Sequence, residues 1–169
     1  PKAVLDPGIF NRWGPDFAVE HGLVLACNEG AVMTVGFGHR YPSVEVWSTS
    51  RVDQPWRVDD EGIDAVSDLL HAAHVAVSDD VPANEEWHYR PMGTGVTVPW
   101  RIILKLRIST LAGFEGGTKI YVNTISPAAL AAMLLPKLFQ ARAAGRIAPM
   151  DLGDECEIPR GALAATWVR

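Results

Sequence analysis

The sequence lacks the features that mark membrane-spanning, secreted and nucleic-acid-binding proteins. No apolar run approaches the ~18 residues that a membrane-spanning helix needs, and the N-terminus has no hydrophobic signal region. Lys and Arg form no cluster, and 15 of them against 20 Asp and Glu give a net charge of -5. We therefore expect neither a membrane nor a nucleic acid among the partners of this protein.

Cysteine is also scarce, and the chain does not begin with methionine. Cys27 and Cys156 lie far apart and neither has a neighbouring metal-ligand motif, so the sequence indicates neither a disulfide framework nor a zinc site. This cysteine usage fits a reducing, cytoplasmic location. Because no start residue precedes Pro1, we expect a processed or excised piece of a longer protein.

The composition is that of one globular domain with a core of its own: 169 residues, 48% hydrophobic and 21% charged. Two segments carry helix signals. Residues 60–77 have an apolar stripe behind a capping aspartate, and a second helix follows Ser126-Pro127 and ends near Gly145. Pro136 should kink or split this second helix.

The remaining segments are strand-like. Strands are predicted for residues 23–26, 31–35, 44–49, 84–90, 99–108 and 119–123. The order of elements predicts an α+β domain on a mostly antiparallel sheet, with one long helix after the first strands and a second helix after the last strand. We expect this domain to occupy residues 1–146, and residues 147–169, which lack periodicity, to form an extended C-terminal tail.

The clearest of these strands alternates an apolar face with a face that carries Arg101, Lys105 and Arg107. Lys105 and Arg107 would lie ~6.6 Å apart, and such a row of donors suits a phosphate or diphosphate. Alternatively, carboxylates such as Glu45 and Glu86 neutralise the row through cross-strand pairs. The sequence leaves both interpretations open.

Histidines are the other candidates for chemistry, and none of the five belongs to an H-x-H or H-E-x-x-H motif. His71 and His74 could reach one metal from a helix, but the segment brings no third ligand, which favours ordinary surface histidines. His88 is the catalytic candidate because it would share a strand face with Glu86 and Arg90. A hydrogen-bonded sheet histidine is the alternative.

Glycine-rich stretches, which often bind phosphates through backbone amides, provide no recognised motif. Residues 36–38, 93–95 and 113–119 match neither G-x-G-x-x-G nor G-x-x-x-x-G-K-[ST]. The first two stretches predict turns between strands.

Three segments resemble, in the right order, one protein family. Residues 40–47, RYPSVEVW, are similar to its R-F-P-x-E-V-W strand, and residues 100–107 to its H-W-H-I-x-I-L-P-R strand. Residues 112–123, AGFEGGTKIYVN, are similar to its A-G-F-E-x-G-T-G-x-Y-I-N segment, and a proline-initiated, alanine-rich helix follows. The family is that of galactose-1-phosphate uridylyltransferase-like (GalT-like) proteins of the histidine-triad (HIT) superfamily, and the resemblance covers about residues 17–145.

Those transferases have two similar halves, each a HIT-like sheet with a helix, and this chain resembles the second, C-terminal half. The resemblance implies a HIT-like fold for residues 1–146. It also implies that Phe114 and Glu115 match residues that contact the hexose, since a carboxylate binds sugar hydroxyls and an aromatic ring packs against the sugar. A salt bridge from Glu115 to Lys119 or to the Arg101 face is the alternative role.

The chain departs from the family at the strand that should carry two histidines. Pro99-Trp100-Arg101 stands where the family has His-Trp-His, so both imidazoles are absent. Neither proline nor arginine binds zinc or iron, and we predict no metal and no other cofactor in this chain. Without an H-x-H nucleophile, these residues alone should not carry out nucleotidyl transfer.

The resemblance therefore implies the C-terminal half of a nucleotidyltransferase-like protein of the hexose-1-phosphate uridylyltransferase type. It would contact a nucleotide-sugar or sugar phosphate through Arg101, Lys105, Arg107, Phe114 and Glu115, while catalysis comes from a missing N-terminal half. The expected partner is this missing half or a second copy of the chain, because dimers are common in the superfamily. The alternative is a degenerate, non-catalytic HIT-like module that binds a ligand or another protein.

Overall fold

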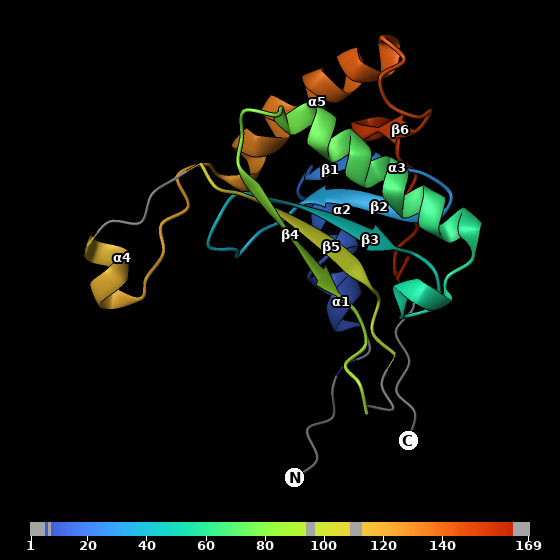
Figure 1. Ribbon diagram of the computed structural model, residues 1–169, viewed down its shortest axis with the longest axis horizontal. Helices are drawn as coiled ribbons and strands as arrows, with labels where there is room; N and C mark the ends of the chain where they lie inside the picture. Colours follow the sequence, from blue (N-terminus) through green and yellow to red (C-terminus); the bar gives the residue numbers. More distant parts are fainter. Residues whose placement is uncertain (1–5, 7, 94–96, 109–112, 164–169) are drawn as a thin grey trace.

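Six strands form one sheet in the computed structural model, which describes residues 6, 8–93, 97–108 and 113–163. The strand order is β4-β5-β3-β2-β1-β6, and each pairing is antiparallel (Figure 1). The bounds are β1 Val24–Cys27, β2 Ala31–Val35, β3 Ser43–Ser48, β4 Ala83–His88, β5 Arg101–Leu106 and β6 Asp151–Leu152. The expected α+β fold on a mostly antiparallel sheet is confirmed.

Helices lie on both faces of the sheet. The long helices α3 and α5 pack against each other and cover one face, whereas the short helices α1 and α2 lie on the other (Figure 1). The bounds are α1 Ile9–Arg12, α2 Pro15–Glu20, α3 Asp60–Val77, α4 Gly113–Thr118 and α5 Pro127–Ala143, with 3-10 helices η1 Pro55–Arg57 and η2 Gly153–Glu155. No helix of the described residues combines the length and the apolar character needed to cross a lipid bilayer.

Both long helices begin where the sequence predicts. Asp59 caps α3 by accepting a backbone hydrogen bond at 3.0 Å, and Ser126 caps α5 in the same way at 3.2 Å. The expected split at Pro136 does not occur, and α5 continues through it. Pro136 leaves the carbonyl of Ala132 without its helical partner, but both residues are exposed, so water can bind that carbonyl.

The main core lies between the sheet and the α3–α5 layer. Trp100, Ile102 and Leu104 point into it, as the alternation along β5 predicts, together with Leu69 of α3 and Leu138 of α5. Each of these five side chains is at most 1% exposed. Packing against this helix layer therefore fixes the register of β5, the strand that carries the candidate contact residues Arg101 and Lys105.

A smaller buried group lies on the opposite face of the sheet. Val32, Trp47 and Ile103 alternate with core residues along β2, β3 and β5 and are buried as well. The turn between α1 and α2 covers Trp47, because a Cβ at Gly14 would come within 3.0 Å of the indole ring. Only glycine permits so close an approach of the backbone.

The sequence prediction is wrong at the end of β5 and beyond it. β5 ends at Leu106, so Arg107 follows the strand and is exposed. Residues 119–123, predicted as a strand, form neither strand nor helix, and the glycine-rich residues before them form α4. A strand needs a neighbouring strand to satisfy its amides and carbonyls, whereas the α4 segment projects away from the sheet (Figure 1).

Of the glycine-rich turns, residues 36–38 do connect β2 with β3, as predicted. Thr94 and Gly95 of the second predicted turn lie outside the described residues. The same applies to Ala112 of the third family segment and to the last six residues of the predicted tail.

Part of the predicted tail joins the sheet. β6 pairs with β1, and Arg142 of α5 donates two hydrogen bonds of 2.5 and 2.9 Å to Glu155 of η2. Glu155 also accepts a hydrogen bond from the Leu152 amide at 3.0 Å. The Arg142 guanidinium, and then the Leu152 amide, lower the pKa of the Glu155 carboxyl to about 2. This carboxylate therefore connects α5 with the β6 edge of the sheet.

Replacing Glu155 with glutamine is expected to destabilise the protein at neutral pH and to have no effect in strong acid. A carboxyl whose folded-state pKa is lowered stabilises the fold fully above its ordinary value of 4.5, and this contribution is lost as the pH falls from 4.5 to about 2. Urea unfolding at a series of pH values measures the difference between wild type and Glu155→Gln. Glu157→Gln, a nearby exposed position, is the control, and a difference that does not change with pH would contradict this assignment.

Candidate functional site

Polar side chains gather on the face of β3, β5 and β4 that points away from α3 and α5. The register explains why: Glu45 of β3 and Glu86 of β4 both lie opposite Ile103 of β5, while Trp47 and His88 both lie opposite Arg101. Residues opposite one another in neighbouring strands share a face, so each row brings side chains from three strands together. We call this surface the polar face; it consists of Ser43, Glu45, Trp47, Asn84, Glu86, His88, Arg101, Ile103 and Lys105.

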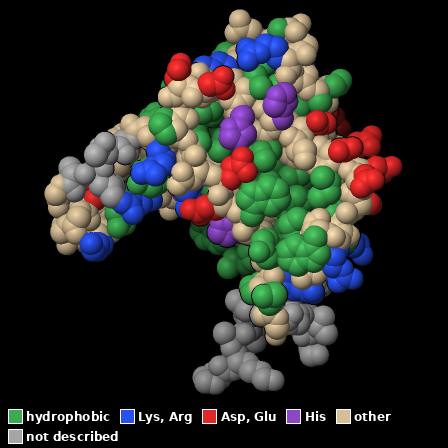
Figure 2. Space-filling model, viewed as in Figure 1, with side chains coloured by type: hydrophobic (Ala, Val, Ile, Leu, Met, Phe, Trp, Pro, Cys, Tyr) green, Lys and Arg blue, Asp and Glu red, His purple; other side chains and the backbone are tan. Residues whose placement is uncertain are grey.

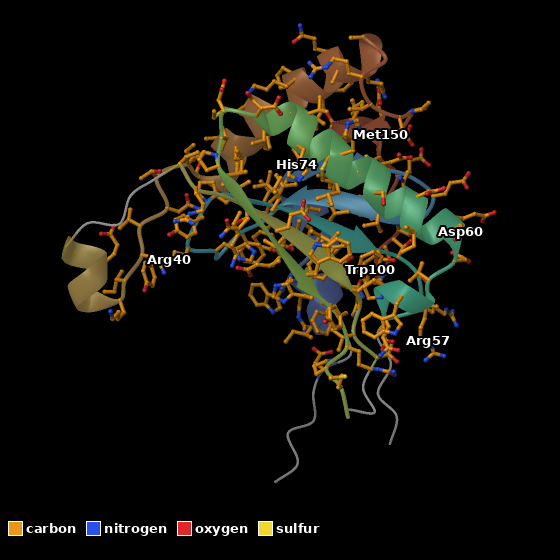
Figure 3. The ribbon with its side chains drawn as sticks, in the orientation of Figure 1. Arg40, Arg57, Asp60, His74, Trp100 and Met150 are labelled. Atoms are coloured by element: carbon orange, nitrogen blue, oxygen red, sulfur yellow. The ribbon has the colours of Figure 1, made fainter. Side chains whose placement is uncertain are left out.

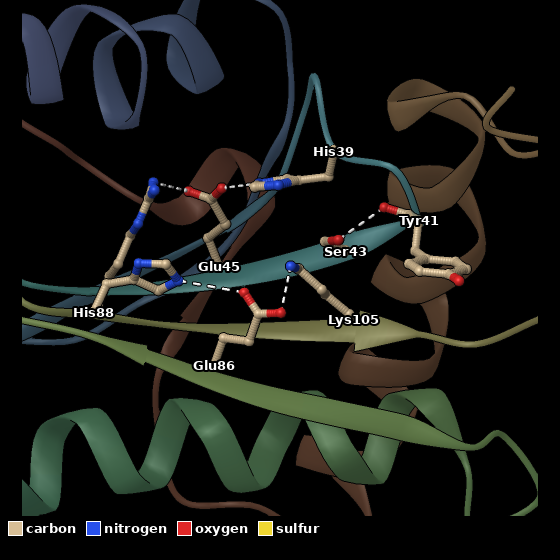
Figure 4. Close-up of polar contacts among 8 residues, drawn as sticks. His39, Tyr41, Ser43, Glu45, Glu86, His88 and Lys105 are labelled. Carbon is tan, nitrogen blue, oxygen red and sulfur yellow. Dashed lines mark hydrogen bonds and ion pairs between the residues drawn. The ribbon is translucent and has the colours of Figure 1, made fainter. Parts of the chain in front are cut away.

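A buried carboxylate joins an imidazole and a guanidinium at the centre of the polar face. Glu45 is only 5% exposed. One of its oxygens contacts Nε2 of His39, and the other accepts a hydrogen bond of 3.2 Å from Nη1 of Arg101 (Figure 4). The Arg101 guanidinium also lies over the Trp47 ring, with its central carbon 4.4 Å from the ring centroid. Two contacts thus hold the Arg101 head group in place.

A second carboxylate makes a similar arrangement nearer the edge of the sheet. Lys105 donates a hydrogen bond of 2.5 Å to Glu86, and Nε2 of His88 lies 3.5 Å from the other oxygen of the same carboxylate (Figure 4). Lys105, and to a smaller degree His88, lower the pKa of the Glu86 carboxyl below its usual value. This group is more open to solvent than the first, since the Glu86 side chain is 42% exposed.

The geometry matches the cross-strand pairing that the sequence offered as one of two interpretations of the cationic strand. Arg101 and Lys105 each have a carboxylate partner, Glu45 and Glu86 respectively. This pairing still leaves groups on the polar face that can donate or accept protons, because each carboxylate also contacts an imidazole. When a carboxylate accepts a hydrogen bond from one nitrogen of a neutral imidazole ring, the other ring nitrogen has a free lone pair and can act as an acceptor or base.

Three of the predicted contact residues do not join this cluster. Arg107 lies past the end of β5, where its amide bonds to the carbonyl of Pro82 at 2.7 Å. Phe114 and Glu115 lie on α4, which projects away from the sheet (Figure 1). The α4 segment returns to the body through Tyr121, whose ring lies 4.1 Å from the guanidinium carbon of Arg40 (Figure 3).

Of the two histidines on α3, His74 has a structural partner. His74 of α3 lies 2.8 Å from a carboxylate oxygen of Glu85 on β4, so it connects the helix layer to the edge strand (Figure 3). His71 lies on the exposed side of the same helix. Within the described part of the chain, no group of three or more His, Cys, Asp or Glu side chains could hold a metal ion. The absence of a metal at Pro99 and Arg101 stays a prediction from their side chains, neither of which is a donor for zinc or iron.

His39, which no sequence pattern indicated, contacts the polar face through Glu45. It lies in the connection between β2 and β3, outside any periodic segment, and no motif includes it. Its neighbour in space is Gly36: a Cβ at that position would come within 2.7 Å of the His39 ring. The glycine allows the loop to fold back and place the ring against Glu45. The sequence signal for the position of His39 was therefore Gly36, three residues before it.

Comparison with known proteins places this geometry in context. A protein-family model described as "Domain of unknown function (DUF4921)" matches residues 2–165. No curated protein sequence matches the chain. Solved structures do match. A uridylyltransferase superposes with a TM-score of 0.60 at 15% identity, covering 75% of this chain and 48% of that one.

Two plant structures are similar to the same degree. An ADP-glucose phosphorylase from Arabidopsis thaliana, with bound ADP-glucose, matches with a TM-score of 0.60 and 20% identity, covering 78% of this chain and 50% of that one. A GalT-like protein from Arabidopsis thaliana matches with a TM-score of 0.58 and 20% identity, covering 78% and 51%. This chain spans about half the length of each of these structures.

Identities this low establish a shared fold and nothing about substrate. The similarity does confirm that the antiparallel sheet and its helices have the GalT-like, HIT-type arrangement expected from the sequence segments. The family match extends over nearly all of the chain. The chain therefore belongs to the family described as "Domain of unknown function (DUF4921)", and its fold is that of GalT-like proteins.

Proposed function

We propose that this chain is the C-terminal half of a GalT-like nucleotidyltransferase and that its polar face contacts the anionic part of a nucleotide-sugar or sugar phosphate. The observation that carries the proposal is the grouping of two cations and two imidazoles on adjoining elements: Arg101 with His39, and Lys105 with His88. The GalT-like fold and a length of about half that of the matched structures support it. Catalysis would come from another half, since the chain has no H-x-H motif.

Lys105 is the group best placed to receive an incoming anion. Its ammonium is partly exposed, and its partner Glu86 is exposed enough to rotate into solvent. A phosphate that takes the place of the Glu86 carboxylate would contact both Lys105 and His88, because Glu86 now touches both. Charge-assisted hydrogen bonds of this kind are among the stronger polar contacts in proteins.

Arg101 would act on the ligand from a fixed position. Its guanidinium is held by the buried Glu45 and by the Trp47 ring, so it offers its remaining N–H donors in one orientation. Phe114 and Glu115 stay predicted hexose contacts, and this role requires α4 to reach the ligand in an assembled protein. Arg107, which follows β5, also stays a predicted contact, and this role requires its side chain to reach the ligand in an assembled protein.

Replacing Lys105 with alanine is expected to weaken binding of glucose 1-phosphate or UMP by about 10- to 150-fold, because one charge-assisted contact contributes roughly 1.5–3 kcal/mol. Isothermal titration calorimetry on the purified chain measures the change. Lys137→Ala, which removes an exposed lysine from α5, is the matched control and should leave the affinity unchanged. Glu86→Gln should strengthen binding, since it removes the carboxylate that competes for Lys105.

Three results would contradict the proposal. If Lys105→Ala and Lys137→Ala bound both ligands equally well, or if neither ligand bound the folded chain, the polar face would not be an anion site. If the chain by itself transferred UMP and His88→Ala abolished the transfer, the assignment of catalysis to another half would be wrong.

A protein-interaction module is the second candidate, and a surface feature favours it. Large hydrophobic side chains are exposed around the end of β4: Trp56, Trp87, Tyr89 and Met92. Trp56 packs edge-on against Tyr89 at 5.1 Å, and Figure 2 shows hydrophobic side chains gathered beside Lys and Arg on this side of the molecule. Exposed aromatic clusters of this kind are typical of protein interfaces. Under this candidate, Trp56→Ala would disrupt an assembly while Lys105→Ala would not affect it.

A further inference from the structure

The two cysteines, remote in sequence, lie side by side at one end of the sheet. Cys27 is the last residue of β1 and lies opposite Asp151 of β6. The η2 turn then brings the chain back, so that Sγ of Cys156 lies 3.3 Å from the carbonyl oxygen of Asp151. Both cysteines therefore adjoin the same residue, and both are free thiols.

The two thiols also affect each other directly. Burial raises the pKa of both, and a side-chain hydrogen bond between them lowers that of Cys27 and raises that of Cys156 further. Of the two, Cys27 lines an open cavity of about 890 Å³, together with Arg142, Met150 and Glu157, so a low-molecular-weight disulfide can approach it from this side.

We propose that Cys27 and Cys156 form a reversible disulfide when the protein meets a low-molecular-weight disulfide oxidant. The bond would join β1 to the segment that follows β6. It would add a covalent link at an edge of the sheet where the edge strand, β6, has only two residues. Only the local position of η2 has to adjust, since the strand pairing already places Cys27 beside Asp151 and the η2 turn places Cys156 there. Neither thiol belongs to the polar face, so the site is independent of the function proposed above.

The oxidation balances as two thiol–disulfide exchanges. The Cys27 thiolate attacks oxidised glutathione, forms a mixed disulfide and releases one glutathione thiolate. The Cys156 thiolate then attacks the Cys27 sulfur and releases the second glutathione. Two protons and two electrons leave the protein thiols, and two molecules of reduced glutathione are formed. A thiol reductant reverses both steps.

The disulfide would stabilise the protein mainly through its unfolded state. The bond closes most of the chain, from position 27 to position 156, into one loop, and closing a long loop restricts the unfolded chain more than closing a short one. We expect the melting temperature of the oxidised protein to rise by several degrees and to return to its original value on reduction.

Incubation of the folded, full chain with oxidised glutathione tests the proposal. Intact-mass measurement should show the loss of two hydrogen atoms and no retained glutathione, and a non-reducing peptide map should join the peptides that contain Cys27 and Cys156. Cys156→Ser should instead retain one glutathione on Cys27, and Cys27→Ser should show no intramolecular bond.

Two outcomes would overturn the proposal. In one, glutathione stays attached to Cys27 of the wild-type protein and no internal disulfide forms. In the other, both thiols stay free under native conditions, although the urea-unfolded chain is oxidised by the same reagent. The unfolded chain serves as the control for the reagent, so neither result depends on whether a substituted protein folds.

Discussion

Replacing Trp100 with alanine is expected to lower the free energy of unfolding by about 3–5 kcal/mol, as is typical when a large aromatic is removed from a core. The Trp100 side chain is 1% exposed, and its ring packs against Trp87 with the centroids 6.0 Å apart. The carbonyl of Trp100 accepts a hydrogen bond from the Ser48 amide, so the residue also aligns β5 with β3. The neighbouring backbone cannot collapse into the vacated space without disturbing that alignment.

Trp56→Ala is the matched control for this substitution. It removes the same side chain from a position that is 61% exposed, where the ring packs edge-on against Tyr89. Urea denaturation followed by circular dichroism gives both free energies, and the exposed substitution should cost well under 1 kcal/mol beside the buried one. Equal losses in the two variants would mean that Trp100 does not hold the core as the structure indicates.

Replacing Arg101 with methionine is expected to cost about 3 kcal/mol, because it leaves the Glu45 carboxylate buried without its cation. The Glu45 side chain is 7% exposed and the Arg101 side chain 24%. The double variant Glu45→Met/Arg101→Met should lose less stability than the sum of the two single variants. The difference, measured by a double-mutant cycle, is the coupling between the two side chains.

The second ion pair of the polar face provides the control for that cycle. Lys105 and Glu86 make a contact at least as short, but the Glu86 side chain is 42% exposed. An exposed pair typically contributes about 0–1 kcal/mol, so Lys105→Met should have little effect on stability. If both pairs gave the same small coupling, burial of Glu45 would not be what makes Arg101 important to the fold.

These two expectations determine how binding experiments on the polar face should be designed. Loss of ligand binding in an Arg101 variant would combine lost contacts with lost stability, since Arg101 holds Glu45 and covers Trp47. Lys105 and Glu86 can be changed with little cost to the fold, so they report on the ligand alone. For this reason the proposed function is best tested at Lys105.

Several features of the fold could be predicted from the sequence because they depend on neighbouring residues. The capping Asp59 and Ser126-Pro127 determine where α3 and α5 begin, and both helices have the expected start. The alternation of Trp100, Ile102 and Leu104 predicted which side of β5 faces the core. Caps and periodicity act within a few residues, so a single sequence contains the information.

Residues 119–123 were mispredicted for the opposite reason. Their composition favours a strand, but a strand forms only beside another strand, and α4 and the residues after it lie away from the sheet. At Pro136 the sequence predicted a kink or a split; α5 is not split, and the carbonyl that the proline leaves unpaired is at an exposed position where water can bind it. Local preference is decided by the surroundings in both cases.

The sequence alone determined an acidic α+β domain, its two long helices, and a strand with an apolar and a cationic face. Only the tertiary structure decided which groups meet. Strand register paired Arg101 with Glu45 and Lys105 with Glu86, a loop brought His39 to Glu45, and the β1–β6 pairing together with the η2 turn brought Cys27 and Cys156 to the same residue, Asp151. These contacts join residues that are distant along the chain, and they depend on packing of the whole core, to which no local pattern of residues corresponds.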